Sequence, residues 1–229
     1  MVLSLGGSII LKGEGDAQYL KELRSVLTSF KSDMNFIIVT GGGRTAREFI
    51  KTGRDLGCDE ATLDWMGIEA TRLNSWLVIS SLWPECNPRP FTGIDEALNW
   101  SSVYPFTIGG GTHPGQTTDA VSALIAERWR ADLFINMTSV DGAYTTDPLT
   151  DPDARRIDEM TSLELVELVS LTDRKAGSHS PMDPLASKIV HRAGLRTCIL
   201  NGRDLRSFRD CLEGRQFNGT RIINDTKGA

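Results

Sequence analysis

The chain has 229 residues, of which 40% are hydrophobic and 24% charged, values that are ordinary for a soluble globular protein. Acidic residues outnumber basic ones by 30 to 25, and the formal net charge of −5 argues against a nucleic-acid partner held by a basic surface. No apolar stretch reaches the roughly 18 residues of a transmembrane helix, and the first residues do not resemble a signal peptide, so we expect a cytoplasmic protein with no membrane partner.

The first 137 residues alternate short apolar runs with segments of helical periodicity. We expect strands at residues 2–5, 36–40, 103–108 and 132–137. We expect helices at residues 19–30, 44–55, 61–82 and 117–129, with a short connector at residues 96–100 after a proline-rich stretch. The run at residues 36–40 is wholly apolar apart from its last residue, which is typical of a strand covered by helices on both faces.

Beyond Thr145 the composition shifts toward turn residues, with a loop at residues 147–153. We expect helices at residues 162–171 and 184–193, the second of them capped by Asp183 with Pro184 in its first turn. A strand follows at residues 197–200, and residues 217–223 are expected to form a closing hairpin around Asn218-Gly219. The alternation of strands and helices along the chain predicts an α/β fold with a mainly parallel sheet.

Three glycine clusters follow predicted strands: Gly6-Gly7, Gly41-Gly42-Gly43 and Gly109-Gly110-Gly111. Glycine lets the backbone approach a ligand closely, and the N-terminus of a following helix offers free N–H groups and a partial positive charge. One such turn is a weak indication of a phosphate site. Three of them favour a ligand with several phosphates, or two phosphorylated ligands that face each other.

The second cluster is followed by Arg44 and Arg47, which lie three residues apart and share a helix face near the positive end of the helix. Backbone donors together with a guanidinium group suit a clamped phosphate, although a tight turn with solvated arginines is the alternative. The spacing fits neither a P-loop nor a G-x-G-x-x-G fingerprint, whose third glycine would stand at Ala46. A dinucleotide-dependent dehydrogenase is therefore disfavoured.

The most distinctive string of the chain runs from Thr112 to Asp119, with the sequence Thr-His-Pro-Gly-Gln-Thr-Thr-Asp. Its hydroxyl groups and N–H groups could hold a base edge or a phosphate. Asp119, at a helix start, is as consistent with a capping role as with catalysis. Lys188, on a predicted helix, could reach transferring phosphate oxygens or could be merely solvated.

The cysteines and histidines show no metal-binding pattern. The four cysteines are Cys58, Cys86, Cys198 and Cys211. None of them has the C-x-x-C spacing of a zinc or redox site, so we expect buried thiols. His179 and His191 likewise lack partners at metal-ligand spacing, and no metal site made of protein side chains is predicted.

Together the strings LSLGGS, VTGGGRTAR, GGGTHPGQTTDA, TSVDGAYTTDP and KAGSHSPMDPLASKI resemble the amino acid kinase superfamily, and most closely its archaeal-type uridylate (UMP) kinases. The resemblance covers nearly the whole chain, and THPGQTTDA is its most specific part. It implies a three-layer αβα sandwich with a mainly parallel central sheet, formed as a single domain of residues 1–229. Residues 1–137 would hold the acceptor nucleotide and residues 138–229 would lie on the ATP side. The subunits would assemble as a homohexamer.

Position by position, the resemblance implies two nucleotide sites and a set of catalytic residues. The UMP site would consist of Gly42, Asp64, Thr112, His113, Pro114, Gly115, Gln116, Thr117 and Thr118. The ATP site would consist of Gly7, Ser8, Gly43, Arg47, Thr138, Ser139, Tyr144 and Asp147. Catalysis would rest on Arg47, Asp119 and Lys188, with Mg²⁺ arriving with ATP. The reaction would be in-line transfer of the ATP γ-phosphoryl group to UMP, which needs alignment and charge stabilisation but no strong general base.

Two positions depart from the pattern of the superfamily. Most members carry a lysine two residues before the first Gly-Gly, where this chain has Ser4, although other archaeal uridylate kinases also lack this lysine. At Ser139 the related sequences usually show asparagine. A kinase for another small acid or phosphate, such as isopentenyl phosphate, is the close alternative. A non-catalytic nucleotide- or oxyanion-binding protein on the same fold is the alternative that the absence of the lysine favours.

Overall fold

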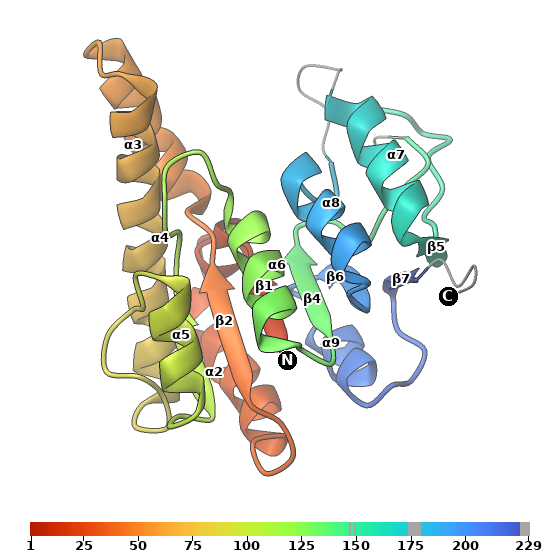
Figure 1. The fold of residues 1–229 in the computed structure, drawn as a ribbon, viewed down its shortest axis with the longest axis horizontal. Coiled ribbons are helices and arrows are strands. Elements are labelled where there is room, and N and C mark those ends of the chain that lie inside the picture. Colours follow the sequence, from red (N-terminus) through yellow and green to blue (C-terminus); the bar gives the residue numbers. More distant parts are fainter. Residues whose placement is uncertain (147, 149, 174–179, 225–229) are drawn as a thin grey trace.

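The computed structural model describes residues 1–146, 148, 150–173 and 180–224. Within these ranges the strands form one seven-stranded sheet in the order β3-β2-β1-β4-β6-β7-β5 (Figure 1). The strands are β1 (Val2–Leu5), β2 (Phe36–Thr40), β3 (Phe106–Gly109), β4 (Phe134–Thr138), β5 (Glu159–Thr161), β6 (Thr197–Asn201) and β7 (Gly219–Ile223). The first four strands and β6 are mutually parallel, and β7 runs antiparallel to β6.

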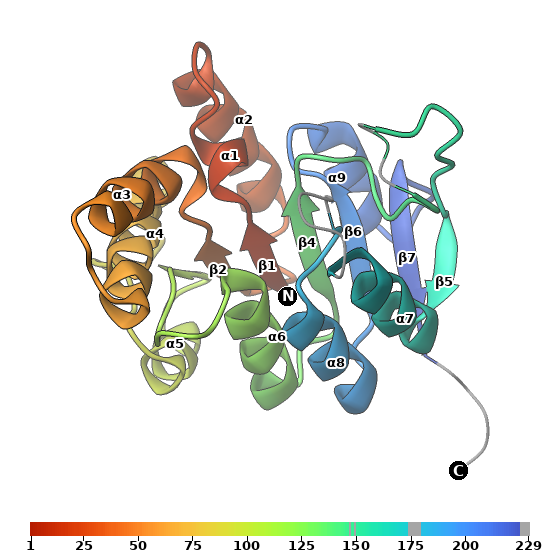
Figure 2. The same cartoon turned by 90° about the horizontal axis from the view of Figure 1, so that it is seen from above.

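Helices cover both faces of the sheet, as Figure 2 shows. One face is covered by α2 (Asp16–Ser29), α4 (Glu60–Leu82) and α9 (Leu205–Leu212). The other face is covered by α5 (Ile94–Ser101), α6 (Thr118–Trp129), α7 (Ser162–Asp173) and α8 (Pro184–Ala193). The short α1 (Gly7–Ile10) follows β1, and α3 (Gly43–Asp55) packs against α4. Because successive strand residues point to opposite faces, Leu3 and Ile38 enter one apolar core while Val2 and Ile37 enter the other.

This arrangement confirms the predicted three-layer α/β fold, and several predicted elements agree with the structure closely. The bounds of β1, β2 and α8 are those expected, and Asp183 caps α8 by accepting the N–H groups of Leu185 and Ala186. Cys86, Cys198 and Cys211 are buried as expected, whereas Cys58 is half-exposed. Within the described ranges, no helix has both the length and the apolar character needed to cross a membrane.

Three expectations were wrong, and two elements were not predicted. Residues 96–100 are not a connector but part of α5, and the strand expected from residue 103 begins only at Phe106, where β2 provides a partner. Residues 217–223 do not form a hairpin around Asn218-Gly219, because β7 pairs with β6 on one side and β5 on the other. Neither β5 nor α9 was expected at all. Strand pairing depends on segments distant in sequence, so local turn residues predicted it poorly.

Candidate functional site

The first two glycine clusters lie back to back at the carboxyl edge of the parallel strands. A Cβ atom on Gly7 would lie 2.3 Å from the nitrogen of Gly43 and 2.5 Å from the carbonyl oxygen of Gly41. Gly43 also has a φ of +60°, a conformation that side chains disfavour. Only glycine fits this contact. The contact between Gly7 and Gly43 places the N-termini of α1 and α3 side by side. The first N–H groups of each helix have no acceptor within the helix.

The third cluster packs against other elements. A Cβ on Gly109 would meet the ring of Phe91 at 2.4 Å, and a Cβ on Gly110 would meet Oγ1 of Thr71 at 2.2 Å. The nitrogen of Gly111 donates a hydrogen bond to the same Thr71 oxygen at 2.7 Å. This cluster therefore anchors the start of the segment Thr112–Asp119 to α4.

A buried polar ridge on α4, made of Thr71, Asn74 and Ser75, holds the glycine turns. Asn74 Nδ2 donates to the carbonyl oxygens of Gly41 at 2.7 Å and Gly42 at 3.2 Å. Thr71 holds the third cluster, and Ser75 lies 2.8 Å from the hydroxyl oxygen of Thr40 at the end of β2. These three residues were not predicted from the sequence. Their signal was polar side chains at helical spacing on the face of α4 that also carries apolar core residues.

Asp119 lies where β1 and β4 meet. Ser4 of β1 is paired with Asn136 of β4, and the Ser4 hydroxyl donates to Asp119 Oδ1 at 2.6 Å, while Asn136 Nδ2 lies 3.5 Å from Oδ2. Strand order reverses here, since β2 and β3 lie on one side of β1 and β4 on the other. Ligands of open α/β sheets bind at such a switch point.

Asp119 does not cap α6, because Thr117 does so by accepting the N–H group of Ala120 at 3.1 Å. Burial raises the pKa of the Asp119 carboxyl group to about 6, and the negative charge of Asp183 adds to the rise. The hydrogen bonds from Ser4 and Asn136 oppose this shift. A carboxylate with such a shifted pKa at a strand junction is a functional-site candidate.

The segment between Thr112 and Thr118 contacts two helices besides its own. The nitrogen of Gly115 donates to Asp64 Oδ2 of α4 at 2.7 Å, and the Thr117 hydroxyl donates to Asp183 Oδ2 at 2.5 Å. Thr112 is buried and bonds Gln116 at 3.3 Å, whereas His113 is exposed. Asp64 therefore contacts the segment 112–118, with which it was predicted to form the UMP site.

Comparison with known proteins agrees with this geometry. The model of the amino acid kinase family matches residues 1–201. The chain belongs to the amino acid kinase family. A uridylate kinase of Methanococcoides burtonii is 44% identical over 204 residues, which are 89% of this chain and 87% of that protein. A uridylate kinase of Pyrococcus abyssi is 37% identical over 220 residues, which are 96% of this chain and 98% of that one.

Solved structures show the same amino acid kinase fold. The crystal structure of a uridylate kinase from Archaeoglobus fulgidus superposes with a TM-score of 0.87 at 38% identity, covering 97% of this chain and 99% of that one. A UMP kinase from Bacillus anthracis superposes with a TM-score of 0.79 at 20% identity, covering 98% and 96%. The resemblance predicted from the sequence is confirmed at the level of family and fold.

Two cationic residues of this amino acid kinase remain in solvent. Arg47 lies on the first turns of α3 and Lys188 on α8, and both are exposed. Neither forms an ion pair with another described residue, whereas Arg44 pairs with Glu48 at 3.3 Å. The structure therefore leaves both charges available to a ligand, but it shows no contact between them and Asp119.

The residues expected around the nucleoside of ATP lie at the end of β4 and in the segment that follows it. Thr138 ends that strand, and its carbonyl oxygen accepts the N–H group of Gly202 at 2.9 Å. Ser139 is exposed, and Tyr144 lines a small hollow with Val140 and Leu168. Asp147 and His179, both named in the sequence analysis, lie outside the described residues.

Proposed function

We propose that this chain transfers the γ-phosphoryl group of ATP to the α-phosphate of UMP, giving UDP and ADP. The observation that carries the proposal is the contact between the Gly7 turn and the Gly43 turn. Two helix N-termini placed side by side suit two phosphorylated ligands whose phosphates must meet. The choice of UMP as acceptor is supported by the uridylate kinases that are 36–44% identical to this chain.

In the proposed complex the two parts of the chain surround different nucleosides. Residues 1–137 hold UMP, with Asp64 and the segment Thr112–Thr118 around its nucleoside and Gly42 near its phosphate. The hydrogen bond from Gly115 to Asp64 supports this grouping. Residues 138–229 lie on the ATP side, where Thr138, Ser139, Tyr144 and Asp147 surround the nucleoside. Gly7, Ser8, Gly43 and Arg47 lie against the ATP phosphates.

The proposed chemistry relies on charge stabilisation rather than on proton removal, because the acceptor phosphate is already anionic. Arg47 and Lys188 neutralise the transferring group. The carboxylates of Asp119 and Asp183 are oxygen donors close enough to couple electrostatically, which fits the ligand preference of Mg²⁺. Mg²⁺ bound with ATP supplies further charge neutralisation at the phosphates. The hydrogen bonds from Ser4 and Asn136 fix the position of the Asp119 carboxylate, which would hold that cation.

The proposal is tested by incubating a panel of acceptors with Mg²⁺-ATP at near-neutral pH and measuring the phosphorylated product and ADP. We expect UDP and ADP in equal amounts from UMP, and little or no product from carbamate, acetylglutamate or isopentenyl phosphate. If UMP yields no UDP while another acceptor is phosphorylated, the chain is a different kinase of the same family. A chelator of Mg²⁺ is the control, and it should abolish turnover.

A second candidate is a non-catalytic nucleotide-binding protein on the same fold. It is favoured by Ser4, which stands where most of the superfamily places a lysine and which is committed to Asp119 by a 2.6 Å hydrogen bond. This candidate predicts that UMP and ATP raise the melting temperature without any release of ADP. Measuring melting and ADP release on the same preparation separates the two candidates.

Replacing Asn74 with alanine is expected to raise KM for both nucleotides about tenfold. The substitution removes the side-chain donor to the carbonyl groups of Gly41 and Gly42, and only the Gly42 carbonyl keeps another described donor, the N–H group of Ala46. The free energy of unfolding should fall by about 1–3 kcal/mol, as expected for a buried acceptor left unpaired. Steady-state kinetics and urea unfolding measure the two effects. Ser80→Ala, on the exposed side of the same helix, is the matched control, and an equal effect there would refute the role of Asn74.

We also propose that the chain forms a homo-oligomer, and a homohexamer by resemblance to its family. The support is an apolar stripe on the outer side of α4, formed by Trp65, Leu73, Trp76 and Leu77, all exposed. Exposed apolar patches of this kind mark interaction surfaces. Trp76→Glu should therefore yield a smaller species by size-exclusion chromatography with light scattering. Leu163→Glu on α7, with the same 46% exposure, is the matched control and should leave the mass unchanged.

A further inference from the structure

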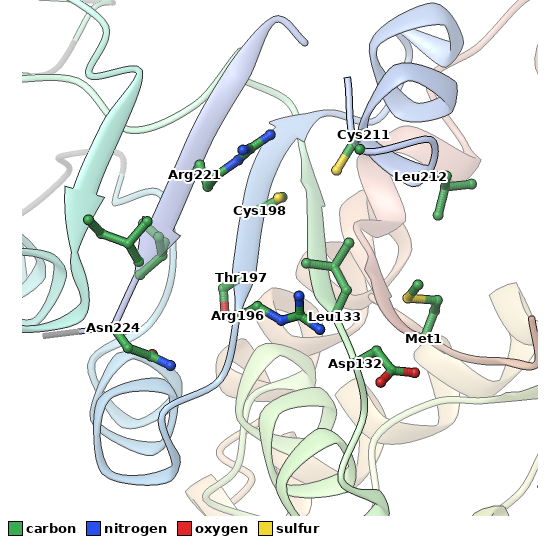
Figure 3. Close-up of a pocket in the computed structure, with 13 residues that line it drawn as sticks. Met1, Asp132, Leu133, Arg196, Thr197, Cys198, Cys211, Leu212, Arg221 and Asn224 are labelled. Carbon is green, nitrogen blue, oxygen red and sulfur yellow. The ribbon is translucent and has the colours of Figure 1, made fainter. Parts of the chain in front are cut away.

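A cavity of about 530 Å³ lies beside β6 and β7 (Figure 3). Leu133 precedes β4, Thr197 begins β6 and Ile222 lies near the end of the antiparallel β7, so these residues mark the amino edge of the parallel strands. The nucleotide turns lie at the carboxyl edge. The two sites are therefore separated by the length of the strands, roughly 3.3 Å per residue. The cavity is distinct from the proposed nucleotide site.

The floor of the cavity is apolar. Leu133 and Cys198 come from the sheet, and Cys211 and Leu212 come from the last turn of α9. Cys198, Cys211 and Leu212 are nearly inaccessible from outside, at 3%, 4% and 6% exposure. The volume falls within the roughly 300–1,000 Å³ of small-molecule sites, which combine an apolar lining with a few polar groups.

The polar groups at its rim carry an excess of positive charge. Arg196 precedes β6, and Arg221 of β7 is the cross-strand partner of Cys198, so the two guanidinium groups flank that thiol (Figure 3). Asp132 is the one carboxylate that lines the cavity among the described residues. The net charge of the whole chain is negative, so the cavity rim differs in sign of charge from the molecule as a whole.

The two arginines differ in how they are held. Arg221 lies over the ring of Phe217, with 5.7 Å between its guanidinium carbon and the ring centroid, and donates weakly to the carbonyl oxygen of Arg215 at 3.5 Å. Arg196 makes neither an ion pair nor a side-chain hydrogen bond with any described residue, and neither arginine is paired with a described carboxylate. Both arginines are exposed, and a guanidinium group beside an apolar floor suits an oxyanion that carries an apolar body.

We infer that this cavity is a second ligand site, one that takes a small amphipathic oxyanion. Its carboxylate, sulfonate or phosphate group binds Arg196, and its apolar body covers Leu133, Cys198 and Leu212. The inference does not depend on which acceptor the kinase uses, because no residue of the cavity belongs to the glycine turns or to the segment 112–119.

The test compares two probes that share an apolar body and differ in charge. 1-Anilinonaphthalene-8-sulfonate carries a sulfonate, and N-phenyl-1-naphthylamine is the same body without it. Fluorescence titration of the full chain, with UMP and Mg²⁺-ATP at saturation, should show one sulfonate probe bound per chain. Arg196→Gln should weaken this binding by about 10- to 100-fold, the loss expected for one charge-assisted hydrogen bond, and should leave the neutral probe unaffected. Arg196 is exposed, so its loss should not disturb folding.

Arg24→Gln, an exposed arginine on α2, is the matched control and should bind both probes as the unmodified chain does. The inference is overturned if Arg196→Gln leaves the affinity of the sulfonate probe unchanged, or if the nucleotides displace the probe completely.

Discussion

Asp119→Asn should lower kcat by about 100- to 1,000-fold and at the same time make the protein more stable at pH 7. Asparagine keeps the shape of the side chain and can still accept the hydrogen bond from Ser4, but it carries no charge for the cation bound with ATP. The loss of activity therefore measures electrostatics rather than packing. Steady-state kinetics with UMP and Mg²⁺-ATP gives the first quantity, and urea unfolding gives the second.

The gain in stability follows from the raised pKa of Asp119. The folded carboxyl group has a pKa of about 6 against 3.8 in the unfolded chain, so the folded state binds the proton more tightly. The stability that this group contributes is fully present below pH 4 and is lost as the pH rises through 6. Asparagine does not suffer this loss, so the variant should gain about 2–3 kcal/mol at pH 7 and no gain at pH 4.

The same pKa sets the pH dependence of turnover. If the ionised carboxylate is required, kcat/KM of the unmodified enzyme should rise as the pH increases through about 6, and the remaining activity of Asp119→Asn should lack this rise. Asp33→Asn, an exposed carboxylate on the opposite edge of the sheet, is the control and should change neither activity nor stability. An Asp119→Asn enzyme with normal kcat would remove Asp119 from the mechanism.

Lys188→Ala should lower kcat by about 100- to 1,000-fold with little change in the free energy of unfolding. Ser4 occupies the position where most of the superfamily has a lysine, and its hydroxyl group is bound to Asp119. In the proposed mechanism, charge neutralisation of the transferring group would therefore fall on Lys188, Arg47 and the cation of ATP. Because Lys188 is exposed and forms no ion pair with a described residue, its removal should not cost stability.

Two further variants separate charge from geometry at this position. Lys188→Arg should recover part of the activity, since it restores the positive charge with a different shape. Lys21→Ala, an exposed lysine on α2, should behave as the unmodified enzyme. The kinetic constants of all three variants are to be measured beside their melting temperatures. Near-normal turnover in Lys188→Ala would leave Arg47 and Mg²⁺ as the stabilising charges.

Local sequence patterns were sufficient for the parts of the fold that depend on near neighbours. The apolar run at Phe36–Thr40 gave a strand with the expected bounds, and the Asp183-Pro184 pair marked the start of α8. Helix caps and apolar periodicity act within a few residues, so they are visible in a single sequence. The clustering of donors in Thr112–Asp119 likewise pointed to the segment that the structure joins to Asp64 and Asp183.

Residues were missed where their role depends on elements far apart in the chain. Asn74 is one polar residue on a long helix, and nothing near it in sequence shows that it donates to Gly41 and Gly42. The segment at 217–223 looked like a hairpin, whereas its partners are β6 and β5. Such contacts depend on which elements the fold places side by side.

The sequence determined the three glycine turns, the strand–helix alternation and the distinctive loop before α6, because each is a local chemical pattern. Packing decided how they combine. The first two glycine turns touch because the backbones of Gly7 and Gly43 pack directly against each other. The third glycine turn packs against Thr71 of α4 instead. Whether Asp119 caps α6 was likewise undecided from the sequence, and the structure shows that Thr117 caps this helix while Asp119 lies where β1 and β4 pair. Their pairing buries the carboxylate between Ser4 and Asn136, and the resulting loss of solvation raises its pKa.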